Sequence, residues 1–246
     1  MKNINKYMIF LFILLLQGVA SAQYSGLYGE NLNQNSNRLQ GKLTGEVYYL
    51  SLTSNASYFL QKDWVEGTIT LKDGDVFEGI RLRYMAYGDE LVVYNSNIKA
   101  LFIVDKNTVK QFTFKTPLSS GNFAERKFIN LDSTGVSLDK TYFEELYSGT
   151  VKMLVFHQIE ERKISPYIDS SGKLNDTDFR LKTIYYQYSK VNGLTRFQLK
   201  NRSLFTLFPE NKKEIIKLLR KNKIDITDES SAVQAFDLLD TNGFLK

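Results

Sequence analysis

The stretch from Trp64 to Phe114 constrains the fold most, because short apolar runs alternate there with turn residues. Polar and apolar side chains alternate along residues 64–72 and 75–83, which is the period of a β-strand with one buried face. Between these runs stands Asp73-Gly74, a dipeptide typical of the two-residue turn of a β-hairpin. The sequence therefore predicts an antiparallel hairpin in this stretch.

This turn implies a register whose cross-strand pairs are Glu66–Arg81, Thr68–Gly79, Thr70–Phe77 and Lys72–Asp75. The other face of the hairpin then carries the aliphatic residues Val65, Ile69, Leu71, Val76, Ile80 and Leu82. Glu78 is predicted to lie among these aliphatic side chains. Trp64 falls opposite Arg83, where an indole ring and a guanidinium group can stack.

Further strands are predicted along the chain. Turn residues separate the runs 91–94, 98–104 and 108–114, for which a β-meander is the simplest order. A strand is also predicted over 126–131. Residues 151–159 are apolar on both faces, as in a central strand of a sheet.

Ser148-Gly149 predicts a hairpin that places Glu145 opposite Lys152. Residues 141–147 also fit the apolar stripe of a helix, so a helix is the alternative. The hairpin is the favoured interpretation because it pairs opposite charges.

Asn192-Gly193 is the strongest short turn signal in the chain and predicts a hairpin that places Tyr188 opposite Phe197. Residues 166–179 are polar and precede this hairpin. We expect them to form a surface loop.

From Asn201 the spacing of the apolar residues becomes helical. Two helices are predicted, one that begins at Pro209 and one over 228–239. We therefore expect an α+β protein in which antiparallel meanders and hairpins form an open sheet or a partial barrel. The β-rich body spans 46–200, and a small C-terminal helical unit spans 201–246.

Residues 1–22 have the composition of a secretory signal peptide. Lys2 and Lys6 precede an apolar run, and Ala20-Ser21-Ala22 supplies the small residues that signal peptidase requires. A polar leader over 23–45 follows, with little to bury. We expect an exported protein that has no transmembrane span after the signal is removed.

Three stretches carry a resemblance to other proteins: SYFLQKDWVEGTITLKDGDVFEGIRLRYMAYGDEL, FEELYSGTVKMLVFH and LFTLFPENKKEIIKLLRKNKIDI. In these stretches the chain resembles an uncharacterised group of exported, β-rich proteins of Bacteroidota. The resemblance extends from about Asn55 to the C-terminus. It implies a β-rich architecture and a periplasmic or extracellular location in a Gram-negative bacterium, and it implies no catalytic residue.

Composition excludes several classes of chemistry. The chain has no cysteine and a single histidine, His157, which follows an apolar strand and is interpreted as a packed residue. Thiol catalysis, disulfides and a histidine-rich zinc site are therefore excluded, and no G-x-S-x-G motif supplies a nucleophilic serine. Without Lys2 and Lys6 the chain has 30 basic and 27 acidic residues, too even a balance to indicate a nucleic-acid partner. We expect no cofactor and no metal.

Glu78 and Glu144 are the carboxylates that the predicted registers place among apolar neighbours. Desolvation there would raise their pKa values, which would suit a general acid. A glycosidase needs two such groups on facing walls of a cleft, so a secreted or periplasmic hydrolase of this kind is the alternative hypothesis. The simpler explanation is that each carboxylate meets a basic partner or lies on an open face.

Two surfaces are candidates for binding. Flat rings suit sugars or protein partners, and the aromatic and basic candidates are Trp64, Arg83, Tyr185 and Tyr188. The basic side of the first predicted helix carries Lys213, Lys217, Arg220 and Lys221, for which a solvated helix face is the simpler explanation.

The favoured hypothesis is an exported, non-catalytic protein that binds a partner or belongs to the cell envelope. Its expected partner is an envelope protein, a glycan or an anionic membrane surface.

Overall fold

The computed structural model describes residues 43, 45–48, 56–96, 99–117, 121–131, 140–170, 172 and 174–245. The predicted signal peptide and almost all of the predicted polar leader lie outside these residues.

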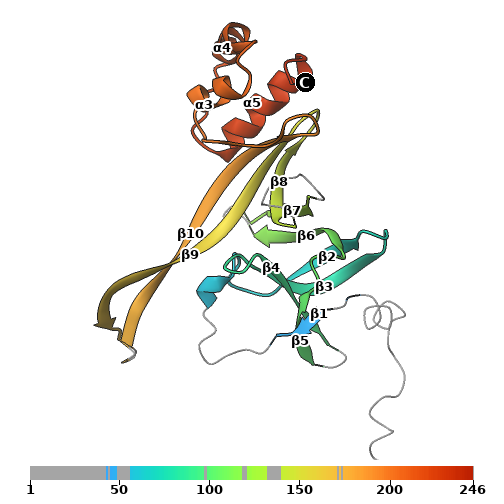
Figure 1. Ribbon diagram of the computed structural model, residues 1–246, viewed down its shortest axis with the longest axis vertical. Coiled ribbons are helices and arrows are strands. Elements are labelled where there is room, and N and C mark those ends of the chain that lie inside the picture. Colours follow the sequence, from blue (N-terminus) through green and yellow to red (C-terminus); the bar gives the residue numbers. More distant parts are fainter. Residues whose placement is uncertain are drawn as a thin grey trace, which may run out of the picture. The chain divides into compact units, whose positions relative to one another are not determined.

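Eleven strands of the described residues form one antiparallel sheet in the order β1-β5-β4-β3-β2-β6-β7-β8-β9-β10-β11 (Figure 1). The strands are β1 (Gly45–Val47), β2 (Val65–Leu71), β3 (Val76–Met85), β4 (Glu90–Asn95), β5 (Ala100–Val104), β6 (Val109–Pro117), β7 (Phe123–Asn130), β8 (Tyr142–Ser148), β9 (Lys152–Ile168), β10 (Leu174–Ser189) and β11 (Gly193–Phe197). A short 3-10 helix, η2 (Ala56–Tyr58), precedes β2. The sheet is open, with β1 and β11 at its edges, which confirms the predicted fold class.

The position of β6 corrects the predicted meander. β2 to β5 follow that order, but β6 pairs with β2 and not with β5. A short turn still joins β5 to β6, with the Thr108 amide donating to the Asp105 carbonyl at 3.0 Å. Three strands lie between β5 and β6 in the sheet, so the sheet must coil to bring their ends together. Local turn signals do not specify such long-range pairing.

The β2–β3 hairpin is present with a different turn. The Leu71 amide donates to the Asp75 carbonyl, so the loop holds three residues and ends at Gly74, whose φ is 96°. Three-residue hairpin loops commonly end in such a glycine. The extra residue shifts the pairing near the turn by one position, and Ile69 faces Phe77 where Thr70 was predicted to do so.

A β-bulge then restores the predicted register. Gly79 has a φ of 65°, and beyond it Glu66 faces Arg81 as predicted. Between the turn and the bulge, every side chain of β3 therefore lies on the face opposite to the predicted one. Phe77 is therefore buried, whereas Val76 and Glu78 are exposed, so the prediction that Glu78 lies among aliphatic side chains is wrong.

The two later hairpins are also present in other registers. In β8–β9, Ser148 faces Lys152 and Glu145 faces Leu154, which rules out the alternative helix and corrects the predicted register. The predicted opposite-charge pair still forms, because the Lys152 ammonium group binds the Glu145 carboxylate. In β10–β11, Tyr188 faces Leu194, so the predicted Tyr188–Phe197 pair is wrong.

The polar residues 166–179 do not form the surface loop that the sequence predicts. β9 continues to Ile168 and β10 begins at Leu174, so most of this segment is a two-stranded ribbon. A ribbon without a core on either face has no apolar periodicity, and its polar composition is then easily taken for that of a loop.

Aromatic rings fill the main core on one face of the sheet, which we call the inner face. A row of cross-strand partners runs along it from Ile69 through Phe112, Phe128 and Glu144 to Val155. The rings of Phe112 and Phe128 stack with centroids 4.8 Å apart. Glu144 is therefore a carboxylate set into an otherwise apolar row.

Three helices follow the sheet where two were predicted: α3 (Asn201–Leu207), α4 (Lys212–Lys221) and α5 (Glu229–Thr241). Pro209 lies in the turn between α3 and α4, not at a first helical position. Asp228 caps α5, because its carboxylate accepts the Ser231 amide at 2.8 Å and the Ser231 hydroxyl accepts the Asp228 amide.

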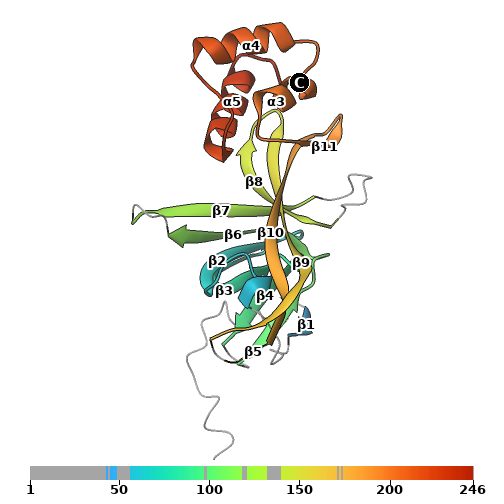
Figure 2. The same ribbon diagram turned by 90° about the vertical axis from the view of Figure 1, so that its left-hand side faces the viewer.

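The helices pack against the end of the sheet formed by the β8–β9 turn and β11 (Figures 1 and 2). Val151, Met153 and Phe197 of the sheet meet Ile215 of α4 and Phe236 of α5 in one buried cluster. The apolar stripe of α4 thus faces the sheet, and its basic side chains face outward.

Asp240 ties the end of α5 to the β8–β9 turn. Its carboxylate accepts hydrogen bonds from the Tyr147 hydroxyl at 2.8 Å and from the Thr150 amide at 2.9 Å. The bond from Thr150 lowers the pKa of Asp240, while burial and the Asp240 carboxylate raise the pKa of Tyr147 to about 12.

Gly149 lies against this contact, and we expect Gly149→Ala to destabilise the protein by about 2 kcal/mol in chemical unfolding. A Cβ atom there would lie 1.9 Å from an Asp240 carboxylate oxygen and 2.5 Å from the Tyr147 hydroxyl. Both side chains must move away, and their hydrogen bonds break. The matched control is the same substitution in an Asp240→Ala background, where a much smaller loss is expected. An equal loss in both backgrounds would contradict this explanation.

Candidate functional site

The most exposed part of the sheet is a ribbon that we call the β9–β10 arm, residues 159–168 and 174–181. Among the described residues, β9 pairs with β8 only up to Val155, and β10 pairs with β11 only from Tyr185 onward. Along the arm the two strands pair with each other. Figure 1 shows β9 and β10 running on together past the strands beside them.

The base of the arm is fixed to the β3–β4 turn and to η2. The Ile159 amide donates to the Ala86 carbonyl at 3.1 Å. The Phe179 ring lies edge-on to the rings of Tyr58 and Tyr87, with centroids 5.0 and 6.0 Å away. The Tyr87 hydroxyl donates to Glu161, a bond that raises the pKa of Tyr87. The arm is therefore held in one direction at its base.

Large apolar side chains of the arm face water. Ile168 and Leu174 are cross-strand partners at the tip and are 69% and 62% exposed. Tyr167 is 53% exposed beside them, and Leu181 is 51% exposed nearer the base. Surface that is both apolar and presented on an extended element is typical of a contact site.

Charged residues alternate along β10 in the row Asp176, Asp178, Arg180 and Lys182, which begins in the arm and ends one residue beyond its base. Alternate residues of a strand share a face, so these four side chains lie on one side. Arg180 binds Asp178 with 2.6 Å between nitrogen and oxygen, and Lys182 binds Glu160 of β9. These exposed pairs add little stability.

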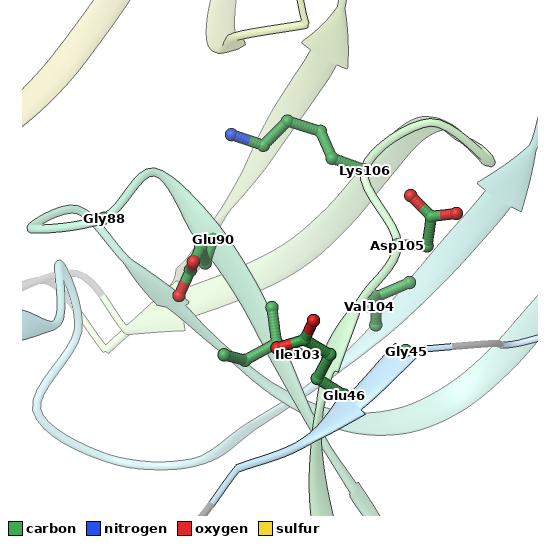
Figure 3. A pocket seen from close by; sticks show the side chains of 8 residues that line it. All are labelled: Gly45, Glu46, Gly88, Glu90, Ile103, Val104, Asp105 and Lys106. Carbon is green, nitrogen blue, oxygen red and sulfur yellow. The ribbon is translucent and has the colours of Figure 1, made fainter.

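A pocket of 480 Å³ lies between β1, β5 and the start of β4 (Figure 3). Its charged lining side chains are Glu46, Glu90, Asp105 and Lys106. Burial raises the pKa of Glu90, and the Asp89 and Glu46 carboxylates add to that effect against the opposing charge of Lys106. The pocket thus offers three carboxylates and one ammonium group.

Asp89 connects this pocket to the aromatic core. Its carboxylate accepts hydrogen bonds from the Tyr84 hydroxyl and from the Lys106 ammonium group, both at 2.7 Å, and from the Tyr142 amide at 3.3 Å. Burial nevertheless raises the pKa of Asp89 because these partners offset it only in part. The contacts hold the β3–β4 turn against β8, which is a structural role.

Glu144 lies in a buried charge cluster with Arg126 and His157. Arg126 binds both carboxylate oxygens of Glu144, at 2.6 and 2.5 Å, in the two-pronged geometry that suits a guanidinium group. Nε2 of His157 lies 2.5 Å from the same carboxylate. Burial alone would raise the pKa of Glu144, but these partners outweigh it and lower the pKa to about 2.

This environment agrees with the simpler explanation that the sequence offers, a carboxylate that meets a basic partner, and contradicts the alternative of a general acid with a raised pKa. Glu144 meets a basic partner and stays ionised at neutral pH, so the expected upward pKa shift is wrong and the group holds no proton to donate. Glu78 lies on an exposed part of β3. The structure therefore does not bring the two carboxylates together in a buried cleft.

Trp64 and Arg83 lie together, as predicted. The Arg83 guanidinium is 5.9 Å from the Trp64 ring and only 3.8 Å from the Phe59 ring. Arg83 also donates to the Gln61 carbonyl at 3.1 Å, and burial lowers its pKa. The guanidinium is thus engaged by the segment that precedes β2 and covers the sheet there.

Tyr185 and Tyr188 do not join this cluster. Tyr185 packs against the helices, and its hydroxyl donates to Glu229 at 2.9 Å. Burial and this bond raise the pKa of Tyr185. Tyr188 belongs to a separate apolar cluster around Phe143 on the other face of the sheet. The four aromatic and basic candidates therefore form no single surface.

The basic helix face is exposed, as its pattern predicts. Lys213, Lys217, Arg220 and Lys221 of α4 all face solvent. No helix among the residues described here is long and apolar enough to cross a membrane. In the same part of the chain, no three His, Cys, Asp or Glu side chains cluster as metal ligands would.

Sequence reasoning missed the arm, although a signal for it is present. Residues 176–182 read Asp-Thr-Asp-Phe-Arg-Leu-Lys, in which charged and uncharged residues alternate as they do in a strand.

Comparisons of the chain with protein-family models, curated proteins and solved structures found no match. The class of protein is therefore given by the fold alone: an open antiparallel sheet with three C-terminal helices and a protruding arm. The resemblance noted in the sequence stays a prediction.

Proposed function

We propose that this protein is an exported, non-catalytic binding protein of the Gram-negative cell envelope, and that it binds another protein chain through the β9–β10 arm. One observation carries the proposal: the arm is anchored at its base and presents Tyr167, Ile168 and Leu174 to water at its tip. Exposed apolar side chains on an anchored element favour a protein partner because little ordering entropy is lost on binding. Export is supported by the composition of residues 1–22, and the Gram-negative envelope is what the resemblance noted in the sequence implies.

The alternative, a hydrolase that uses buried carboxylates, has less support. Its general acid would need a proton, and the partners of Glu144 keep that carboxylate ionised. Glu78 is exposed. The carboxylates that line the pocket between β1, β5 and β4 share it with Lys106 and do not form the facing pair that a glycosidase needs. An anionic membrane would be met elsewhere, by the basic face of α4.

Photo-cross-linking in expressing cells tests the arm as the contact. A photoreactive amino acid placed at Tyr167 or Ile168 is expected to give a discrete protein adduct, which mass spectrometry identifies. Val76 is the matched control, because it is a 54% exposed apolar residue on β3. Lys217 reports on the basic face of α4.

Leu174→Asp should abolish the tip adducts, because it places a charge beside the contact without altering the base of the arm. The proposal fails if the tip positions give no adduct, or if Val76 gives the same one. An adduct formed at Lys217 alone would move the contact to α4.

A further inference from the structure

The geometry points to a specific partner for the arm: the outer edge of β10, residues 177–183, pairs with the same edge of a second copy of this chain. The inference rests on the proposed function, since it names the chain that the arm binds. The pairing is antiparallel and two-fold symmetric, so each copy contributes the same surface.

Backbone geometry shows that this edge can accept a strand. The Ile159 amide donates to Ala86, away from β10, although Ile159 faces Leu181 across the ribbon. In an antiparallel ladder such a pair is a non-hydrogen-bonded one, so Leu181 also turns its N–H and C=O away from β9. By alternation Phe179 and Thr177 do the same. No strand of the described residues covers them.

The charge row fixes one register for the second copy. A two-fold axis beside Phe179 places Asp178 of each copy opposite Arg180 of the other. The same axis places Asp176 opposite Lys182. Each opposite-charge pair then forms twice, on one face of the joined ribbons.

Neighbouring registers are disfavoured by like charges. In a symmetric antiparallel pair, facing side chains lie on the same side of the sheet only if the two-fold axis passes beside a residue. Alternative symmetric registers therefore differ by shifts of the axis from one residue to the next. An axis beside Asp178 or Arg180 pairs that residue with itself. An axis beside Thr177 pairs Asp176 with Asp178, and one beside Leu181 pairs Arg180 with Lys182.

The outer edge of β9 is a poorer template. Its Ile159 amide is already bonded to Ala86, and its pairing with β10 is irregular between Lys163 and Tyr167. Symmetric registers of this edge also pair Glu161 or Arg162 with itself. The inference is therefore confined to β10.

Pairing along β10 would also cover apolar surface. On the face opposite the charge row, Thr177 of one copy lies over Leu181 of the other. The two Phe179 residues are cross-strand partners at the axis, and each ring stays packed against Tyr58 and Tyr87 of its own copy. Leu181 is 51% exposed in the single chain. Its exposure is thus accounted for by the second copy.

The first test is sedimentation equilibrium of the purified protein over a range of concentrations. The protein is expected to dimerise, and Leu181→Pro is expected to weaken the dimer by roughly tenfold or more in Kd, because proline removes an outward N–H. The substitution leaves the β9–β10 hydrogen bonds intact. Leu181→Ala is the matched control, since it shortens the side chain but keeps the N–H, and it should weaken the dimer less.

Cysteine cross-linking tests the register, and the chain has no cysteine of its own. Thr177→Cys combined with Leu181→Cys should form an interchain disulfide, because hydrogen-bonded partners have Cα atoms about 5.5 Å apart. Each single variant should not cross-link. Thr177→Cys combined with Thr183→Cys is the control for a shifted register and should also fail.

Three results would overturn the inference: a protein that is monomeric at every concentration, a dimer that Leu181→Pro leaves unchanged, or preferential cross-linking in the shifted register. If the protein is monomeric but the arm tip still gives an adduct with another protein, the proposed function stands with a different partner. Loss of both the dimer and the adduct would overturn the two together.

Discussion

Replacing Glu144 by alanine is expected to lower the free energy of unfolding by about 3–5 kcal/mol. The substitution leaves the Arg126 guanidinium over the rings of Phe114 and Phe128 without its carboxylate. It also leaves Nε2 of His157 without its anionic partner. Removing one member of a buried charge cluster costs far more than removing an exposed charge.

The effect should depend on pH in a defined direction. The pKa of Glu144 is about 2 in the folded protein, whereas the ordinary pKa of a glutamate side chain is 4.5. A carboxylate with a lowered pKa stabilises the fold above its unfolded-state pKa, and that stability is lost as the pH falls. The difference corresponds to roughly 3 kcal/mol, present above about pH 4.5 and lost between there and about pH 2.

Urea unfolding of the wild type and of Glu144→Ala at pH 7, 4.5 and 2.5 would measure this. The gap in stability between the two proteins should narrow as the pH falls. Glu78→Ala is the matched control, because that carboxylate is exposed and its removal should change stability by no more than about 0.5 kcal/mol. A gap that stays constant from pH 7 to 2.5 would contradict the assigned ionisation of Glu144.

Phe112→Ala is expected to have a comparable effect, about 3–5 kcal/mol. Phe112 is fully buried, and its ring contacts those of Phe128, Tyr142 and Tyr84 with centroids 4.8, 5.1 and 5.9 Å away. The truncation removes these contacts and leaves a cavity between strands that hydrogen bonds hold in place. The surrounding rings therefore cannot close it.

Phe123→Ala provides the control for Phe112→Ala, because Phe123 is 66% exposed at the end of β7. Its substitution should change the unfolding free energy by no more than about 0.5 kcal/mol. Chemical unfolding of both variants, followed by far-UV circular dichroism, would make the comparison. Equal losses at the two positions would show that the aromatic core is not where the structure places it.

The turns show how far the sequence predicts this fold. Asp73-Gly74, Ser148-Gly149 and Asn192-Gly193 each mark a real hairpin, because glycine and its polar neighbours favour turns wherever they occur. Loop length, however, depends on which side chains the flanking strands must bury. Phe77 shows this, since the predicted two-residue turn would have turned this ring away from the apolar face.

The candidate site was less predictable. The sequence points to Glu144 as a buried carboxylate, but its pKa depends on Arg126 of another strand, and only the register of β7 and β8 brings that side chain near. The arm lacks the burial that makes strands visible in a sequence. Its alternating charges are the remaining signal, and they extend over 176–182 alone.

The strand order has a consequence for how the chain folds. From β6 to β11 every strand pairs with the next one along the chain, and among the strands that the structure describes only the β1–β5 and β2–β6 pairs join distant segments. Closing short loops costs little conformational entropy, so a hairpin-by-hairpin meander has a low contact order. We expect the half of the sheet that carries the arm and the helix contacts to form early, with the coiled β1–β5 half docking onto it through the β2–β6 pair.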